Sequence, residues 1–228
     1  MAQFELNLDP FLKLNELTKS AGFSVAGVVN IAQLSGVNGF CCTYNGAQHG
    51  LTEKTVEMLT QIAPTCRFNL RMLPKANLVQ AALDLPVQQV TFYGEGIFES
   101  YKKDLHTFVG QLKDGQRLVS FGIKPDVNEL RHAYKLGGDY VELDINTYAN
   151  AIHPPAQAEA REQLAILAKT AVKNRLGVAV RGQLHYQNVQ PLMTIEEIEN
   201  FILGEGIITR AVFVGLETAI RDMRNLLI

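Results

Sequence analysis

Apolar residues follow two alternating patterns along this chain. Short apolar runs, typical of buried strands, alternate with longer stretches in which apolar positions recur every three or four residues, as in amphipathic helices. The short runs predict strands over residues 4–8, 39–44, 67–72, 88–94, 117–123, 140–145, 177–183 and 200–206. Because each strand is followed by a helix or helix-like segment, the pattern predicts a parallel sheet with helices on its outside.

Helix boundaries carry their own signals. Ser24 and Thr52 are placed to cap two helices, whereas residues 9–23 are expected to link the first strand to the first helix. Further helical segments are expected over residues 101–112, 155–176 and 189–193. After residue 206 the apolar positions from Ile208 to Met223 predict one long amphipathic helix.

Eight strand–helix units within 228 residues predict a closed (β/α)8 TIM barrel. An open, doubly wound sheet is disfavoured because no G-x-G-x-x-G follows the first strand. No stretch rich in Pro, Gly or Ser divides the chain. We therefore expect residues 1–228 to form a single domain.

Composition excludes several classes of function. The chain is 47% hydrophobic and 19% charged with a net charge of −2, and Lys and Arg do not cluster, which argues against nucleic acid as a partner. No apolar run reaches the roughly 18 residues of a membrane span, and no secretory signal opens the sequence, so a cytoplasmic location is expected. Cys41, Cys42 and Cys66 are expected to be small buried hydrophobes, and no metal-binding spacing occurs.

In a TIM barrel the chemistry lies at the carboxyl ends of the strands. Arginine is an unusual residue there, yet Arg71 ends the third expected strand and Arg181 lies near the end of the seventh. Acidic residues accompany them. Glu142 and Asp144 belong to the sixth expected strand, and Glu205 lies near the end of the eighth. The mouth of the barrel, meaning the end at which the strands reach their carboxyl termini, is thus expected to be strongly polar.

Several segments resemble the pyridoxine 5′-phosphate synthase family. The resemblance is carried by "ELNLD" at 5–9, "VNGF" at 37–40, "VELDINTYANA" at 141–151, "LHYQNV" at 184–189 and "GIITRAVFVGLETAIRDM" at 206–223. It implies a cytoplasmic TIM barrel that forms homo-oligomers. It also implies condensation of 1-deoxy-D-xylulose 5-phosphate with 3-amino-2-oxopropyl phosphate, without a metal or redox cofactor.

The chain departs from that family where the resemblance implies proton transfer. The family places histidines after strands one, two and seven, and a glutamate after strand three; the matching positions hold Pro10, Thr43, Gly182 and Arg71. Imine formation, enolisation and loss of water all need proton transfers. The substitutions therefore predict a changed chemistry on a retained scaffold.

Retained and replaced residues near the strand ends together define a candidate site for a small anionic or phosphorylated metabolite. Candidate acid–base groups are Asp144, Glu142 and Glu205. Candidate substrate-binding residues are Asn7, Asp9, Thr43, Asn45, Arg71, Arg181, Gly182, Gly204 and Gly206. Guanidinium groups bind carboxylates and phosphates bidentately, and helix N-termini such as the one after Gly206 attract anions.

Three functions remain open on this sequence. The first is a divergent barrel enzyme that uses Asp144, Glu142 or Glu205 as acid–base groups on another small substrate, which a perturbed carboxylate pKa in an open pocket would favour. The second is a non-catalytic binding or regulatory protein, which a mouth filled by arginine–carboxylate pairs would favour. The third is a working pyridoxine 5′-phosphate synthase, which activity alone would establish.

Overall fold

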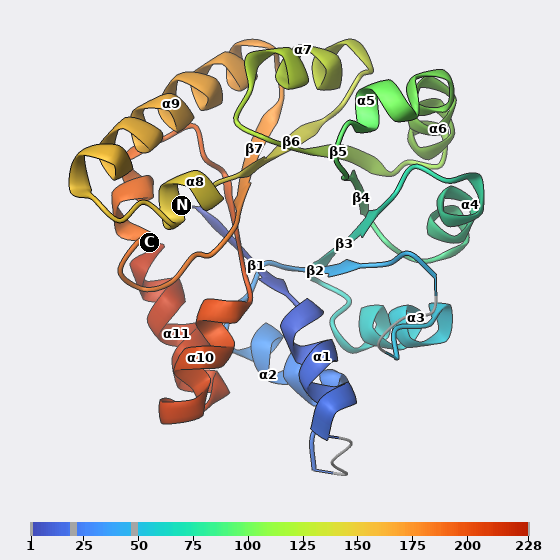
Figure 1. Ribbon diagram of the computed structural model, residues 1–228. Coiled ribbons are helices and arrows are strands. Elements are labelled where there is room, and N and C mark those ends of the chain that lie inside the picture. The colour runs from blue at the N-terminus through green and yellow to red at the C-terminus, as the bar shows by residue number, and fades with distance from the viewer. Residues whose placement is uncertain (1, 19–21, 47–49, 228) are drawn as a thin grey trace.

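The computed structural model describes residues 2–18, 22–46 and 50–227, and it is a closed barrel of eight parallel strands ringed by helices (Figure 1). Each strand pairs with its sequence neighbours, and β1 pairs with β8 to close the barrel. The strands are β1 Gln3–Asn7, β2 Gly39–Thr43, β3 Arg67–Met72, β4 Gln89–Phe92, β5 Leu118–Ile123, β6 Tyr140–Asp144, β7 Gly177–Arg181 and β8 Asn200–Leu203. The predicted TIM barrel is confirmed.

Helices follow the strands on the outside of the barrel. The first half carries α1 Asp9–Thr18, α2 Val25–Leu34, α3 Glu53–Ile62, α4 Ala76–Asp84, α5 Ile97–Ser100 and α6 Lys102–Asp114. The second half carries α7 Val127–Lys135, α8 Asn146–Ala149, α9 Pro154–Lys173, the 3-10 helix Gln190–Thr194, α10 Glu205–Val214 and α11 Leu216–Leu226. Ser24 and Thr52 cap α2 and α3 with their side chains, as predicted.

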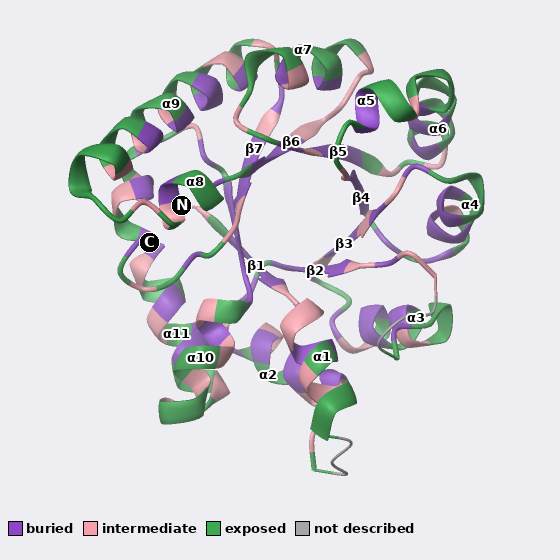
Figure 2. Cartoon of the chain, viewed as in Figure 1, coloured by how far each residue is buried: buried purple, intermediate pink, exposed green. Residues whose placement is uncertain are grey.

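The apolar core lies between the barrel and the helices. Alternate strand residues such as Leu6, Phe68 and Phe121 point outward and are buried under the inner faces of the helices. Figure 2 shows the strands and these helix faces as buried and the outer helix faces as exposed. This shell of large side chains supplies the hydrophobic stabilisation of the fold.

The interior of the barrel is mainly polar, with a small apolar cluster of Cys41, Ala179 and Ile202. Glu5 of β1 accepts hydrogen bonds from Asn69 (3.1 Å) and Asn200 (2.9 Å), and Asn69 accepts one from Thr91 (2.9 Å). Strands β1 and β3 are not neighbours, so the Asn69–Glu5 bond spans the inside of the barrel. Burial raises the pKa of Glu5, although Arg67 and the two amides oppose that shift.

Two predicted elements differ from the structure. The expected link over residues 9–23 contains helix α1. Pro10 is the second residue of this helix, where proline is tolerated because the N–H groups of the first turn have no partner within the helix. The expected single C-terminal helix is interrupted at Gly215, whose φ of 82° no helix can accommodate. Val212, placed on the predicted apolar face, lies within α10 and is 78% exposed.

Candidate functional site

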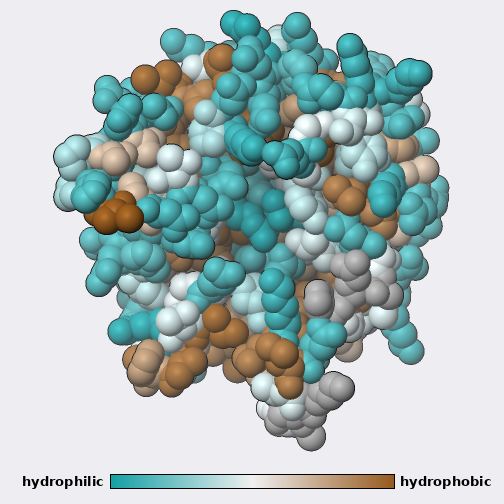
Figure 3. Space-filling model, in the orientation of Figure 1, coloured by the Kyte–Doolittle hydropathy of each residue, from teal (hydrophilic) through white to brown (hydrophobic). Residues whose placement is uncertain are grey.

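A polar pocket of about 330 Å³ lies at the carboxyl ends of the strands, where chemistry is expected in this fold. The space-filling view is hollowed and hydrophilic at the centre of the barrel (Figure 3). Strands β3 to β7 and the segments that follow them supply its lining. Among the lining residues are Arg71, Tyr93, Glu95, Ile123, Lys124, Glu129, Glu142, Asp144, Asn146, Arg181 and Gly182.

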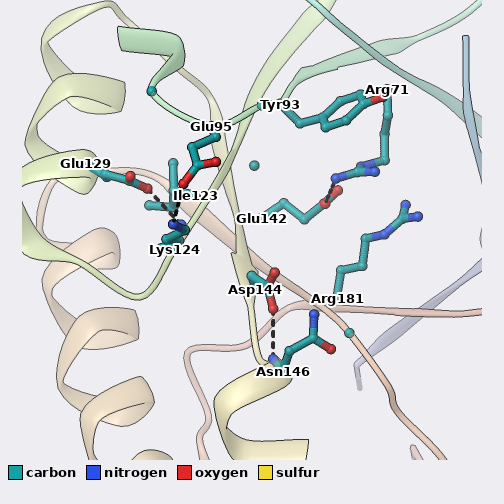
Figure 4. A pocket seen from close by; sticks show the side chains of 14 residues that line it. Arg71, Tyr93, Glu95, Ile123, Lys124, Glu129, Glu142, Asp144, Asn146 and Arg181 are labelled. Atoms are coloured by element: carbon teal, nitrogen blue, oxygen red, sulfur yellow. Dashed lines mark hydrogen bonds and ion pairs between the residues drawn. The ribbon is translucent and has the colours of Figure 1, made fainter. Parts of the chain in front are cut away.

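Arg71 is held in place on two sides. Its Nη2 lies 2.9 Å from Oε1 of Glu142, and its guanidinium stacks on the ring of Tyr93, 4.4 Å from the ring centroid (Figure 4). The two charged side chains are only 12% and 3% exposed. Gly122 leaves room for Tyr93, since a Cβ there would lie 3.1 Å from the Cβ of Tyr93, which is tighter than ordinary contact. A buried charge is retained only when it is paired, so each partner depends on the other.

Asn45 positions this pair from behind. Its Nδ2 donates to the Tyr93 hydroxyl (2.7 Å), and its Oδ1 accepts from the backbone N–H of Leu73 (3.0 Å). Asn45 itself does not line the pocket. Among the candidate substrate-binding residues, it therefore acts on the mouth through Tyr93 and Arg71.

Arg181 forms a second ion pair across the mouth. Its Nη2 donates to Oδ2 of Asp9 (3.1 Å) and its Nη1 to the sulfur of Cys41 (3.3 Å). Asp9 also accepts from the backbone N–H (2.7 Å) and hydroxyl (2.8 Å) of Thr43. Burial alone lowers the pKa of Arg181, but Cys41, Glu142 and Asp9 together raise it, so this side chain stays cationic.

Both guanidinium groups keep unused donors; Arg71 is paired through Nη2, and its Nε has no hydrogen-bond partner among the described residues. Arginine carries five N–H donors, and the hydrogen bonds of Arg181 in the described residues engage two of them. The side chain of Arg181 is 20% exposed, and both arginines border the pocket. The mouth is thus partly filled by ion pairs, while it still offers cationic N–H groups to a ligand.

The candidate carboxylates lie in three different settings. Glu142 is buried against Arg71. Asp144 is exposed at the pocket rim, where its Oδ1 accepts from the N–H of Asn146 (2.8 Å). Glu205 begins α10 and lines a separate cavity of about 620 Å³ with His185 and Arg210. Only the first two therefore share the mouth.

The candidate glycines and Asn7 are likewise divided. Gly182 lines the mouth, whereas Gly206 lines the second cavity and packs against the carbonyl of Leu184. A Cβ on Gly204 would lie 2.8 Å from the carbonyl oxygen of Asn7, so this glycine allows β8 and β1 to approach closely. The side chain of Asn7 accepts from the N–H of Asp9 (3.1 Å).

Some contributors were not predicted as site residues. The stack of Tyr93 on Arg71 and the contact of Cys41 with Arg181 join residues far apart in sequence. Their only signal in the sequence is a position near a strand end. All three cysteines are free and buried, as expected. In the described parts of the chain, no group of three His, Cys, Asp or Glu residues could hold a metal ion.

Comparison with known proteins identifies the family. The protein-family model described as "Pyridoxal phosphate biosynthesis protein PdxJ" matches residues 5–228. The chain belongs to the PdxJ family. A PdxJ relative named pyridoxine 5′-phosphate synthase, from Syntrophobacter fumaroxidans, is 28% identical over 98% of this chain and 98% of its own length. Another, from Pelobacter propionicus, is 27% identical over 100% and 99% of the two chains.

Solved structures support the fold of this PdxJ barrel. KGPDC from Streptococcus mutans matches with a TM-score of 0.68 and 11% sequence identity, over 100% of this chain and 97% of that one. An identity this low supports the barrel architecture alone. As a separate finding, no helix in residues 2–18, 22–46 and 50–227 is long and apolar enough to cross a membrane.

Proposed function

We propose that this PdxJ-family barrel binds a small anionic metabolite at its mouth and does not synthesise pyridoxine 5′-phosphate. One observation carries the proposal. Arg71 and Arg181 are each anchored by one carboxylate, and both border the same pocket. Anchored guanidinium groups lose little conformational entropy when they bind a carboxylate or phosphate.

The setting of Glu142 supports binding without the family's reaction. The synthase reaction needs groups that exchange protons with the substrate. Glu142 is 3% exposed and its Oε1 is paired with Arg71 at 2.9 Å, so a substrate competes with Arg71 for this carboxylate. The resemblance places the family's histidines and glutamate at Pro10, Thr43, Gly182 and Arg71, none of which is an acid–base group near neutral pH.

A working synthase is the second candidate, and the full-length match to proteins named pyridoxine 5′-phosphate synthase favours it. The deciding assay incubates the purified chain with 1-deoxy-D-xylulose 5-phosphate and 3-amino-2-oxopropyl phosphate. Pyridoxine 5′-phosphate is then measured by mass spectrometry. The Syntrophobacter protein serves as the positive control and denatured chain as the blank. We expect no product above the blank; turnover like that of the positive control would refute the proposal.

Binding is tested separately by calorimetric titration with inorganic phosphate and with butanoate. We expect at least one of these anions to bind, and Arg181→Gln to weaken that binding about tenfold. Arg221→Gln is the matched control, because it removes the same charge from an exposed helix pair with Glu217. Equal affinities in the Arg181 and Arg221 variants would exclude the mouth as the binding site.

A further inference from the structure

The charges of the mouth pocket are unevenly distributed. Arg71 and Arg181 lie at one side, and Glu95, Glu129 and Lys124 lie at the other (Figure 4). Three cationic and four anionic side chains line the pocket, which gives its lining one net negative charge. A ligand with two negative charges is repelled by such a lining. A ligand with no net charge but two charged ends matches it.

Asp144 supplies the anionic end that is free for a ligand. It pairs with Arg181 in the register of β6 and β7, but Arg181 bonds Asp9 instead. No cation of the described residues forms an ion pair with Asp144. Glu95 is paired with Lys124, whereas Glu129, like Asp144, accepts only a backbone N–H among the described residues. Of these two carboxylates Asp144 lies beside Arg181, whereas Glu129 lies on the far side of the pocket from both arginines (Figure 4), so Asp144 is the one placed to bind the cationic end of a ligand held by them.

The phosphate-binding end of a TIM barrel is closed off from this pocket. In this fold phosphate commonly binds where the eighth strand leads into a helix N-terminus. Here Glu205 places a carboxylate at that point, and both Glu205 and Gly206 line the other cavity. The carbonyl of Leu184 also fills the space beside Gly206. The N-terminus of α10 therefore supplies no N–H donors to a phosphate bound in the mouth pocket.

From these observations we infer that the ligand of the mouth is an amino carboxylate without a phosphate group. Its carboxylate binds the free N–H donors of Arg71 and Arg181, and its ammonium group binds Asp144. This inference rests on the proposed function and changes one part of it: the ligand binds the arginines through an anionic carboxylate but carries no net charge. Neighbouring strands lie about 5 Å apart, so Asp144 and Arg181 suit groups separated by a few bonds.

The test is calorimetric titration of the full chain with three probes: 4-aminobutanoate, butanoate and 3-aminopropyl phosphate. We expect 4-aminobutanoate to bind about fivefold more tightly than butanoate, because it adds one ion pair at an exposed carboxylate. We expect 3-aminopropyl phosphate to bind more weakly than 4-aminobutanoate. Glycine and 5-aminopentanoate then give the preferred spacing of the two groups.

Asp144→Asn identifies the group that binds the amine. The amide oxygen can still accept the N–H of Asn146, so the local backbone is preserved. We expect this variant to lose the fivefold preference while its affinity for butanoate is unchanged or increased. Asp114→Asn, which removes an exposed charge at the end of α6 outside the pocket, should retain the preference.

The outcomes separate the two proposals. If butanoate binds as tightly as 4-aminobutanoate, or if 3-aminopropyl phosphate binds most tightly, the amino-carboxylate inference is refuted while anion binding at the mouth stands. If neither anion class binds the unmodified chain, the proposed function fails and this inference fails with it. A preference that survives in Asp144→Asn also refutes the inference.

Discussion

Breaking the Arg71–Glu142 pair should destabilise the protein by a measurable and predictable amount. Removal of one partner from a buried ion pair costs about 3–5 kcal/mol. Arg71 borders an open pocket, and glutamine in Glu142→Gln keeps a hydrogen-bond acceptor, so we expect about 2–3 kcal/mol for this variant. At about 2–4 °C per kcal/mol for a chain of this size, Tm should fall by about 5–10 °C.

A double-mutant cycle isolates the interaction itself. Urea denaturation of Arg71→Met, Glu142→Gln and the double variant at pH 7 should give a coupling free energy of about 2 kcal/mol. The exposed Arg221–Glu217 pair, 2.7 Å apart at i,i+4 spacing on α11, is the control and should give about 0.3–0.5 kcal/mol. The reasoning is refuted if the coupling at the mouth is no larger than that on α11.

Two further predictions concern the barrel interior and the C-terminal helices. Burial raises the pKa of Glu5, so the native state holds the carboxyl proton of Glu5 more tightly than the unfolded chain does. The free energy of unfolding should therefore fall as the pH rises from the pKa of Glu5 in the unfolded chain through its raised pKa in the native state. Glu5→Gln should flatten this decline in urea denaturation curves recorded from about pH 4 to 7. Gly215→Ala should cost about 1–3 kcal/mol at φ 82°, whereas Gly110→Ala, inside α6, should gain about 0.5–1 kcal/mol; thermal melts showing the same sign for both would contradict this.

Strand positions were predictable because they depend on local pattern. Residues 67–72 form β3 as expected, since the sequence alternates side chains between the barrel interior and the helices. The same reasoning placed Arg181 at the end of β7. Helix ends were less predictable. Pro10 is compatible with both a link and a first helical turn, and only packing distinguishes them.

The partners of the site residues were not predictable from local pattern. Arg181 lies one strand from Asp144 yet pairs with Asp9, which is 172 positions away in the sequence. A position at a strand end predicts that a side chain lies near the mouth. It does not predict which neighbouring side chain it will contact. Glu205 illustrates the same limit, because β8 ends at Leu203 and the chain has already entered α10.

The two ion pairs of the mouth have a consequence for how the chain folds. Arg71 and Asp9 belong to the segment containing β1–β4, whereas their partners Glu142 and Arg181 belong to the segment containing β5–β8. Each half-barrel alone therefore carries one cation and one anion whose counterions lie in the other half. Separately produced halves would regain these pairs only on association, so the charges favour folding of the barrel as one cooperative unit.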